Sequence, residues 1–366
     1  METKLSKKER IIQFHHSKNK QKYNTIKTKK SLVVAWAPHS VRAEKMAYSL
    51  NSKIFIKGYQ SKAKILSLIK YIKLSINTMR LLQKEKPDLI ICQLPPIFLA
   101  YSILVYKFLT FSTKPDIILD LHSASFFKPW TYFGFMNKYL YKKSKQLIIT
   151  NKQLTTAIDS KYKNKVLILE DAIFRIPKTK IQTNPTISHL PHLSDYNNDK
   201  SFKVGIICSF APDEPISEII ATAKQIPDVK FFITGDYNRI NNKILNNNDS
   251  IIENLYYTGF LEYDDYIKLI SSMDALMVLT KRDKTLLSGC SEAIMLEKPL
   301  ITSNFEVLQK SYNKGTVFVD NSVQQIVNAI TKVRKNYWKL KEEIKCLKEE
   351  KDNEWNMKIN IIKSLI

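Results

Sequence analysis

The sequence has little glycine and little cysteine for its length. Its 366 residues include 7 glycines and 4 cysteines, and the cysteines (Cys92, Cys208, Cys290 and Cys346) lie far apart without a C-x-x-C pair. This spacing argues against a disulfide framework and against a zinc site, and it favours reduced, buried thiols in the cytosol. Five of the 7 glycines fall between residues 205 and 315, so the positions that need glycine are concentrated in the second half of the chain.

Long apolar runs are also absent. The most apolar stretch, residues 97–111, is interrupted by Lys107, and at about fifteen residues it is too short for a helix that spans a membrane. We interpret it as a helix that is buried or touches a membrane. The lysine-rich first 30 residues contain no apolar core of a signal peptide. We therefore expect no export and a cytoplasmic location.

Several motifs of common enzyme classes do not occur. The sequence lacks G-x-x-x-x-G-K-[ST], G-x-G-x-x-G, G-x-S-x-G and H-E-x-x-H, which disfavours a P-loop enzyme, a simple dinucleotide dehydrogenase, a serine hydrolase and a zincin. Histidines pair at His15 and His16 and at His189 and His192, without a cysteine or carboxylate in ligand spacing. We interpret both pairs as loop histidines and predict no metal site.

Positive charge is concentrated in the first half. Residues 1–200 hold 36 Lys and Arg against 12 Asp and Glu, whereas residues 201–366 hold 22 of each, so the net charge of +24 belongs to the first half. Such an asymmetry predicts a polyanionic partner for that half, either nucleic acid or an anionic lipid surface. The alternative is a lysine bias that only keeps the protein soluble.

Short runs rich in Val, Ile and Leu alternate with longer helical patterns from Ser31 onward, which predicts an α/β fold with parallel sheets covered on both faces. The expected strands are 32–35, 53–56, 88–92, 116–121, 146–149 and 165–169, then 204–208, 229–234, 255–258, 275–279, 299–302 and 316–319. The clearest helical patterns are 62–84, 215–224, 263–272, 288–295, 323–347 and 355–366.

Two doubly wound domains fit this order better than one, because 366 residues exceed what a single core usually supports. We expect a basic N-terminal arm over 1–30, a first domain over 31–176, a linker rich in Pro and Asn over 177–202, a second domain over 203–340, and C-terminal helices over 341–366 that return to the first domain. Two such domains facing a cleft would place ligands at the carboxyl ends of their strands.

The segment 280–304, TKRDKTLLSGCSEAIMLEKPLITSN, is the most informative one. A strand is followed by a cationic loop with Lys281, Arg282 and Lys284, and then by a helix that carries Glu292. Backbone N–H groups at a helix start and nearby cations suit a diphosphate, and an ionised carboxylate suits the two hydroxyls of a ribose. A solvated loop followed by a carboxylate that complements the helix dipole is the alternative.

A family resemblance follows from these residues. SEAIMLEKPLITSN at 291–304 and KGTVFVDN at 314–321 resemble the E-A-x-x-x-G-x-P-[VI]-[VI]-x-[ST] and N-G-x-x-[VF] patterns of family 4 glycosyltransferases, which have the GT-B fold. LYYTGFLEYDDYIKLISSMDA at 255–275 is similar to the V-x-F-x-G-x-[VL] stretch of that family and the helix after it. The order and spacing match over about 120 residues.

The resemblance implies a GT-B glycosyltransferase with an acceptor-side first domain and a second domain that binds a nucleotide-sugar. It implies that Glu292 binds the donor ribose. The base would be bordered by Gly259, Phe260 and Leu261, and the diphosphate would lie beside Ser288, Gly289 and Cys290. No cofactor is implied other than the nucleotide-sugar, which is a co-substrate.

Two departures from the family pattern concern the donor. Eight positions before Glu292 the family usually has another glutamate, but this sequence has Lys284, so the contacts to the donor sugar must differ. The Arg and Lys that the family has after the first strand of the second domain are replaced by SFAPDEP at 209–215. We hypothesise that Lys281, Arg282 and Lys284 supply that charge instead.

In the first domain, DLHS at 120–123 ends a strand. Similar GT-B enzymes often carry a histidine there, near the donor sugar. His122 is therefore a candidate for hydrogen bonds to sugar hydroxyls, with Asp120 orienting it or acting separately as a base. A histidine satisfied at a strand end is the alternative. His39 and Arg42 follow the first strand and are candidates for acceptor or phosphate contacts, and the role of residues 170–171 is left open.

An aromatic and basic segment at 126–143 is the candidate for docking on a membrane, because Trp and Tyr favour the headgroup level and lysine favours anionic lipid. A helix packed on the sheet with solvated lysines is the alternative.

The sequence thus predicts a peripheral membrane glycosyltransferase on the inner face of the cell membrane. It would transfer a sugar from a nucleotide-sugar to a saccharide or lipid-linked acceptor in surface polysaccharide or glycoconjugate biosynthesis, with retention implied only by the family. The alternatives are an inactive GT-B scaffold or partner subunit, and a polyanion-binding protein. No reader motif for nucleic acid accompanies the lysines, so we do not expect a nucleic-acid partner.

Overall fold

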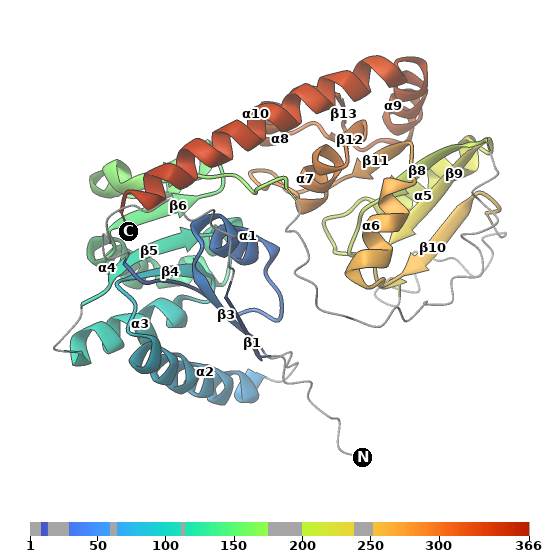
Figure 1. Cartoon of the computed structure of the whole chain (residues 1–366). Helices are drawn as coiled ribbons and strands as arrows, with labels where there is room; N and C mark the ends of the chain where they lie inside the picture. Colours follow the sequence, from blue (N-terminus) through green and yellow to red (C-terminus); the bar gives the residue numbers. More distant parts are fainter. Residues whose placement is uncertain are drawn as a thin grey trace. The chain divides into compact units, whose positions relative to one another are not determined.

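A computed structural model describes residues 9–13, 29–58, 64–110, 114–174, 200–237 and 252–365, without the side chains of 9–13 and 64–68. The chain divides into two compact units (Figure 1). Unit 1 comprises Met1–Ala172 and Asn353–Ile366, and unit 2 comprises Ile173–Asp352. The unit boundaries lie at 172 and 352, whereas the sequence placed the domain ends at 176 and 340. Most of the expected linker and both histidine pairs lie outside the described residues.

Unit 1 is built on a sheet of seven described strands in the order β1-β3-β2-β4-β5-β6-β7. Strands β2 to β7 are parallel, and β1 is an antiparallel edge strand beside β3. Their bounds are β1 Glu9–Gln13, β2 Ser31–Ala35, β3 Lys53–Lys57, β4 Leu89–Leu94, β5 Asp116–Leu121, β6 Gln146–Ile149 and β7 Val166–Ile168. The basic arm thus contributes a strand that its polar sequence did not predict.

Helices of unit 1 cover the sheet. One apolar core joins α2, α3 and α4 to sheet residues such as Leu32, Val34 and Ile90, whereas the end of α10 lies against α1, where Trp355 donates a hydrogen bond to Ser49 at 3.0 Å. The bounds are α1 Val41–Leu50, α2 Lys64–Glu85, α3 Ile97–Leu109 and α4 Gly134–Lys143, with short 3-10 helices η1 Ser123–Phe126, η2 Trp130–Phe133, η3 Lys152–Ala157 and η4 Ser160–Lys165. Helix α10, Tyr337–Lys363, belongs to unit 2 up to Asp352 and to unit 1 from Asn353 onward.

Unit 2 has a parallel sheet in the order β10-β9-β8-β11-β12-β13, which is the strand order of dinucleotide-binding domains. Helices α5 and α9 pack on one apolar core, and α6, α7 and α8 pack on the other. The strands are β8 Phe202–Ile206, β9 Val229–Thr234, β10 Leu255–Gly259, β11 Ala275–Val278, β12 Leu300–Ser303 and β13 Thr316–Val319. The helices are α5 Ile216–Gln225, α6 Tyr263–Ser271, α7 Ser288–Met295, α8 Glu306–Ser311 and α9 Val323–Lys335.

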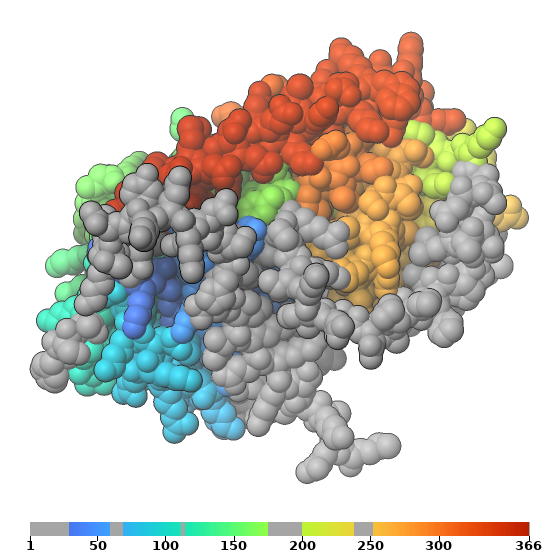
Figure 2. Space-filling view, viewed as in Figure 1, coloured from blue at the N-terminus to red at the C-terminus, as the bar shows by residue number. Residues whose placement is uncertain are grey.

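The predicted pair of doubly wound α/β domains is confirmed. Every strand expected between residues 32 and 319 is present, and each end lies within 2 residues of its expected position. The tail differs, because the two helical segments expected at 323–347 and 355–366 are replaced by α9 and the continuous α10. The outer side of α10 is open to view in red in Figure 2.

Candidate active site

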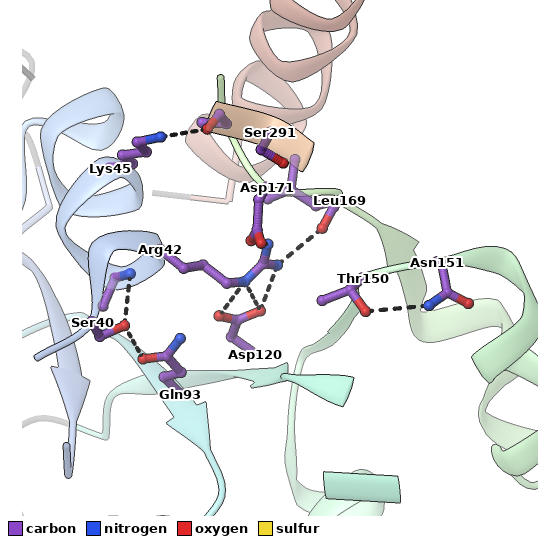
Figure 3. Close-up of polar contacts among 12 residues, drawn as sticks. Ser40, Arg42, Lys45, Gln93, Asp120, Thr150, Asn151, Leu169, Asp171 and Ser291 are labelled. Atoms are coloured by element: carbon purple, nitrogen blue, oxygen red, sulfur yellow. Dashed lines mark hydrogen bonds and ion pairs between the residues drawn. The ribbon is translucent and has the colours of Figure 1, made fainter. Parts of the chain in front are cut away.

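In unit 1, residues from several strands meet at the carboxyl edge of the sheet, where the strand order reverses between β2 and β4. Ser40 caps α1 by accepting a hydrogen bond from the Ala43 N–H at 3.2 Å, and its hydroxyl donates to Gln93 at 2.6 Å. The cap satisfies an N–H that has no partner within the helix. It thereby fixes the first turn of α1, which carries Arg42 (Figure 3).

Arg42, on α1, links the ends of two strands, β5 and β7, through its guanidinium. Its Nε and Nη2 donate to the Asp120 carboxylate at the end of β5, at 2.8 to 3.1 Å. Nη2 also donates to the Leu169 carbonyl at 3.0 Å, and Nη1 donates to Asp171 at 2.8 Å (Figure 3). Nearby, Lys45 donates to the Ala172 carbonyl at 2.6 Å. Residues 169–172 are thus held at this edge by two buried cations of α1.

These contacts correct the roles predicted for Asp120 and Arg42. The side chain of Asp120 is 1% exposed and that of Arg42 is 5% exposed, so neither a base that meets substrate nor a cation that meets phosphate is available here. Both residues form a buried ion pair that holds the loops in place. Asp171 differs, because its side chain is 23% exposed and only its Oδ1 is paired with Arg42.

The charge state of Asp171 follows from its neighbours. Burial by itself would raise the pKa of this carboxyl, but the Arg42 guanidinium, with smaller contributions from His122 and Lys45, lowers the pKa below its usual value. Asp171 is therefore ionised at neutral pH and lies in the electrostatic field of His122.

The two candidate histidines of unit 1 lie in different environments. His122 is half-buried at the start of η1, where its backbone N–H donates to the Leu94 carbonyl at 3.0 Å. Within the described part of the chain, no hydrogen bond to the His122 imidazole is present, so the ring is available to a ligand. His39 is 55% exposed, and its Nδ1 lies 3.6 Å from Glu44.

In unit 2, the loops after β8 and β11 join at the reversal of the strand order. The Asp213 carboxylate accepts hydrogen bonds from Thr280 at 2.8 Å and from Arg282 at 3.2 Å, and Lys281 pairs with Glu218 at 3.0 Å. Two of the cations expected beside a diphosphate are thus paired with acids. Since their side chains are 49% and 51% exposed, each pair contributes only about 0–1 kcal/mol and is readily exchanged for another anion.

The loop after β8 binds its own carboxylate. Glu214 accepts hydrogen bonds from the N–H groups of Ser209 and Ala211, at 2.8 to 3.1 Å, and from the Ser209 hydroxyl at 3.2 Å. Phe210 between them has a positive φ of 57°. This carboxylate takes up the loop amides, which explains how the SFAPDEP sequence forms an ordered turn.

Glu292 lies on α7 and is half-buried. The hydroxyl of Tyr266, on α6, donates a hydrogen bond to its Oε2. Burial and the adjacent carboxylate raise the pKa of Tyr266 well above its usual value, so the phenol keeps its proton and remains a donor. The sequence pattern identified Glu292 but not Tyr266, because the two residues are 26 positions apart and come together only when α6 packs beside α7.

The first turn of α7 lies close to β8. A Cβ on Gly289 would be 2.8 Å from the side chain of Ile207, so glycine permits this approach. Ser288 is exposed. The Cys290 side chain is buried and contacts Thr302 at 3.5 Å, and burial raises the pKa of its thiol to about 12. Only the main chain of Cys290 is therefore placed to border a diphosphate.

Several aromatic side chains lie near the strand ends of unit 2, where the base of the donor nucleotide was expected to bind. β10 ends at Gly259, whose φ of 70° favours glycine, and the next residue, Phe260, is 80% exposed. Leu261 is half-buried. The ring of Tyr257 lies 6.5 Å from that of Phe210 and 6.3 Å from that of Tyr237. We did not predict Phe210, Tyr237 or Tyr257, although each lies at or just after a strand end.

The described residues contain no group of 3 or more His, Cys, Asp or Glu side chains placed to hold a metal ion. In the same part of the chain, no helix has the length and apolar character needed to cross a membrane.

Comparison with known proteins shows which family and which solved structures this chain resembles. Residues 196–350 match the family model of glycosyl transferases group 1. No curated protein matches the chain in sequence. Among solved structures, sucrose-phosphate synthase from Thermosynechococcus elongatus is similar with a TM-score of 0.68 at 10% identity, over 92% of this chain and 98% of that one.

Two further structures are similar over the same span. Anabaena HepE in complex with UDP-glucose has a TM-score of 0.63 at 14% identity, over 92% of this chain and 100% of that one. A glycosyltransferase from Rickettsia africae has a TM-score of 0.62 at 11% identity, over 92% and 98%. These likenesses define the fold of the two units as GT-B. Residues 196–350 thus carry a glycosyl transferases group 1 domain, and this domain, within a GT-B fold, indicates a glycosyltransferase.

Proposed function

We propose that this glycosyltransferase transfers a sugar, of the hexose type, from a nucleoside diphosphate sugar to a saccharide or lipid-linked acceptor in surface polysaccharide or glycoconjugate biosynthesis. Unit 2 would bind the donor nucleotide, and unit 1 would serve the acceptor. Retention of configuration is part of the proposal by analogy with the family. No cofactor beyond the donor is required in this scheme.

The observation that carries the proposal is Glu292. A half-buried carboxylate, bonded to Tyr266 at the carboxyl side of a parallel sheet, is well suited to accept hydrogen bonds from both ribose hydroxyls. The exposed ring of Phe260 supports a nearby base. UDP is the first nucleotide to test, because HepE of Anabaena was solved with UDP-glucose.

The proposed contribution of unit 1 to sugar binding rests on His122 and Asp171. An available imidazole and an oriented, partly exposed carboxylate at one sheet edge suit sugar hydroxyls. A lipid-linked acceptor would place the enzyme at the inner face of the cell membrane, and the net charge of residues 1–200 supports this location.

A thermal-shift screen against UDP, GDP, ADP and CMP tests the donor site. At a hundred times its Kd, a nucleotide stabilises the folded protein by about 2.7 kcal/mol, which raises the Tm of a domain of this size by about 5 to 10 °C. We expect one nucleotide to produce this shift, Glu292→Ala to remove it, and Glu342→Ala, an exposed glutamate of α10, to keep it.

The same assay tests the predicted role of the loop cations. Lys284→Ala should weaken binding of the nucleotide-sugar, and an unchanged affinity would refute the hypothesis that Lys284 supplies charge to the diphosphate.

A second candidate function is a GT-B scaffold without activity. Lys284 favours it, because this lysine stands where a family 4 enzyme usually has a glutamate, so the contacts to a donor sugar differ. Absence of a shift with every nucleotide would select the scaffold.

A further inference from the structure

The outer surface of unit 1 has an unusual helical layer. Helices α2, α3 and α4 lie side by side, since the rings of Tyr71 and Phe98 are 5.0 Å apart and the Tyr101 ring stacks on that of Tyr139 at 6.4 Å. All three helices contribute to the same core beneath. Atoms of this layer, in cyan, lie at the surface at the lower left of Figure 2.

The sides of these helices that face away from the core carry large apolar residues. A helix on the surface of a soluble protein normally exposes polar residues there. Instead, Phe108 is 83% exposed and Phe135 is 87% exposed. The other exposed apolar residues of the layer are Ile69, Ile72, Ile76, Val105, Leu109 and Tyr139. We call these eight residues the apolar face. Exposed apolar side chains gathered on one layer of helices indicate an interaction site.

The three helices that carry the apolar face contain many basic residues and almost no acidic ones. Residues 69–85, 97–109 and 134–143 contain eight Lys and Arg and a single carboxylate, Glu85, which is paired with Lys53 at 2.6 Å. Lys73, Lys138 and Lys142 are among the exposed cations, and Lys138 lies 3.5 Å from Asp159, which precedes η4. A partner that fits this surface must offer apolar groups to the exposed aromatic and aliphatic side chains and negative charge to the lysines.

We propose that the apolar face docks unit 1 onto an anionic lipid bilayer, with the aromatic and aliphatic side chains in the interfacial region and the lysines on the headgroups. The proposal extends the proposed function by assigning the membrane contact to α2, α3 and α4, beyond the segment 126–143 that the sequence indicated. A second copy of the chain fits poorly, because a symmetric dimer would bring two such cationic faces together.

Flotation of the purified full chain with vesicles tests the proposal. We expect binding to phosphatidylcholine vesicles that contain phosphatidylglycerol, little binding to phosphatidylcholine alone, and weaker binding as salt is raised. Phe108→Ser with Phe135→Ser should weaken binding at least about tenfold. Lys138→Glu with Lys142→Glu should weaken it by about fivefold or more for each residue changed.

Matched controls lie elsewhere on the molecule. Trp338→Ser removes an aromatic side chain that is 73% exposed on α10, and Lys332→Glu with Lys335→Glu reverses exposed charges on α9. Both controls should bind vesicles within about twofold of the unaltered protein, since single exposed residues outside an interface contribute little.

Three outcomes would overturn the proposal. They are no binding of the unaltered protein to anionic vesicles, equal losses in the control variants, and a dimer in gel filtration that Phe108→Ser with Phe135→Ser dissociates while vesicle binding is unchanged. The nucleotide-induced thermal shift, measured on the same preparation, separates failure of the membrane contact from failure of the proposed donor site.

Discussion

Replacing Arg42 with leucine should destabilise unit 1 strongly. Asp120, which is 1% exposed, would lose its hydrogen bonds to Nε and Nη2 and would remain as a buried carboxylate without a counter-ion. The Leu169 carbonyl and Asp171 would each lose a donor as well. Removing one partner of a buried ion pair costs about 3–5 kcal/mol, and we expect a loss in that range.

Urea denaturation followed by tryptophan fluorescence measures this loss. Trp36 is a suitable reporter of unit 1, because it is 7% exposed and its indole N–H donates to Thr78 at 2.9 Å. Arg80→Leu is the matched control, since Arg80 is exposed on α2 and its removal should change stability by about 0.5 kcal/mol or less.

A second variant separates the loss of the ion pair from a general effect of the substitution. Arg42→Leu with Asp120→Leu removes both charges, so no buried carboxylate is left without a partner, and we expect it to be more stable than Arg42→Leu alone. The reasoning fails if Arg42→Leu loses less than about 1 kcal/mol, or if the double variant is no more stable than the single one.

Three further predictions concern other contacts. Because the pKa of Asp171 is lowered in the folded protein, its stabilisation should be complete above the usual aspartate pKa and be lost as pH falls through the folded value. Asp171→Asn should therefore flatten the acid limb of a Tm-against-pH curve, and an unchanged limb would contradict this. Tyr266→Phe should reduce the preference for UDP over 2′-deoxy-UDP in calorimetry as Glu292→Ala does; an unaltered preference would separate Tyr266 from ribose binding. Asn254→Ala removes a side-chain amide whose two N–H donors lie 2.8 to 3.0 Å from the carbonyls of Ala223, Ile226 and Val229, where α5 ends and β9 begins, and should cost about 2 kcal/mol in urea denaturation; a loss within about 0.5 kcal/mol would contradict it.

The strands of both sheets could be predicted from the sequence because a parallel strand covered on both faces is a local apolar run. The runs at 116–121, 146–149 and 229–234 coincide with β5, β6 and β9. β1 was missed, since it lies in a polar, basic arm and owes its conformation to pairing with β3. The continuous α10 was missed because its charged middle gives little periodic signal.

The sequence likewise indicated some residues of the candidate site and missed others, because only local patterns can be recognised in a sequence. Glu292 was found because it lies in a local motif beside a helix start, where the spacing of residues carries the information. The partners of Arg42 were not found, because Asp120 and Asp171 are 78 and 129 positions away. Asp120 looked like a catalytic candidate in sequence, and only its burial beside Arg42 shows a structural role.

The sequence alone determined two doubly wound domains and a basic first half, and it singled out Glu292 as a candidate for the donor site, because periodicity, composition and motif spacing are properties of neighbouring residues. Only the tertiary structure decided which charges are buried in pairs, that Tyr266 reaches Glu292, and that three helices present one apolar and cationic surface. Those properties depend on distances between residues far apart in the chain, and packing sets such distances.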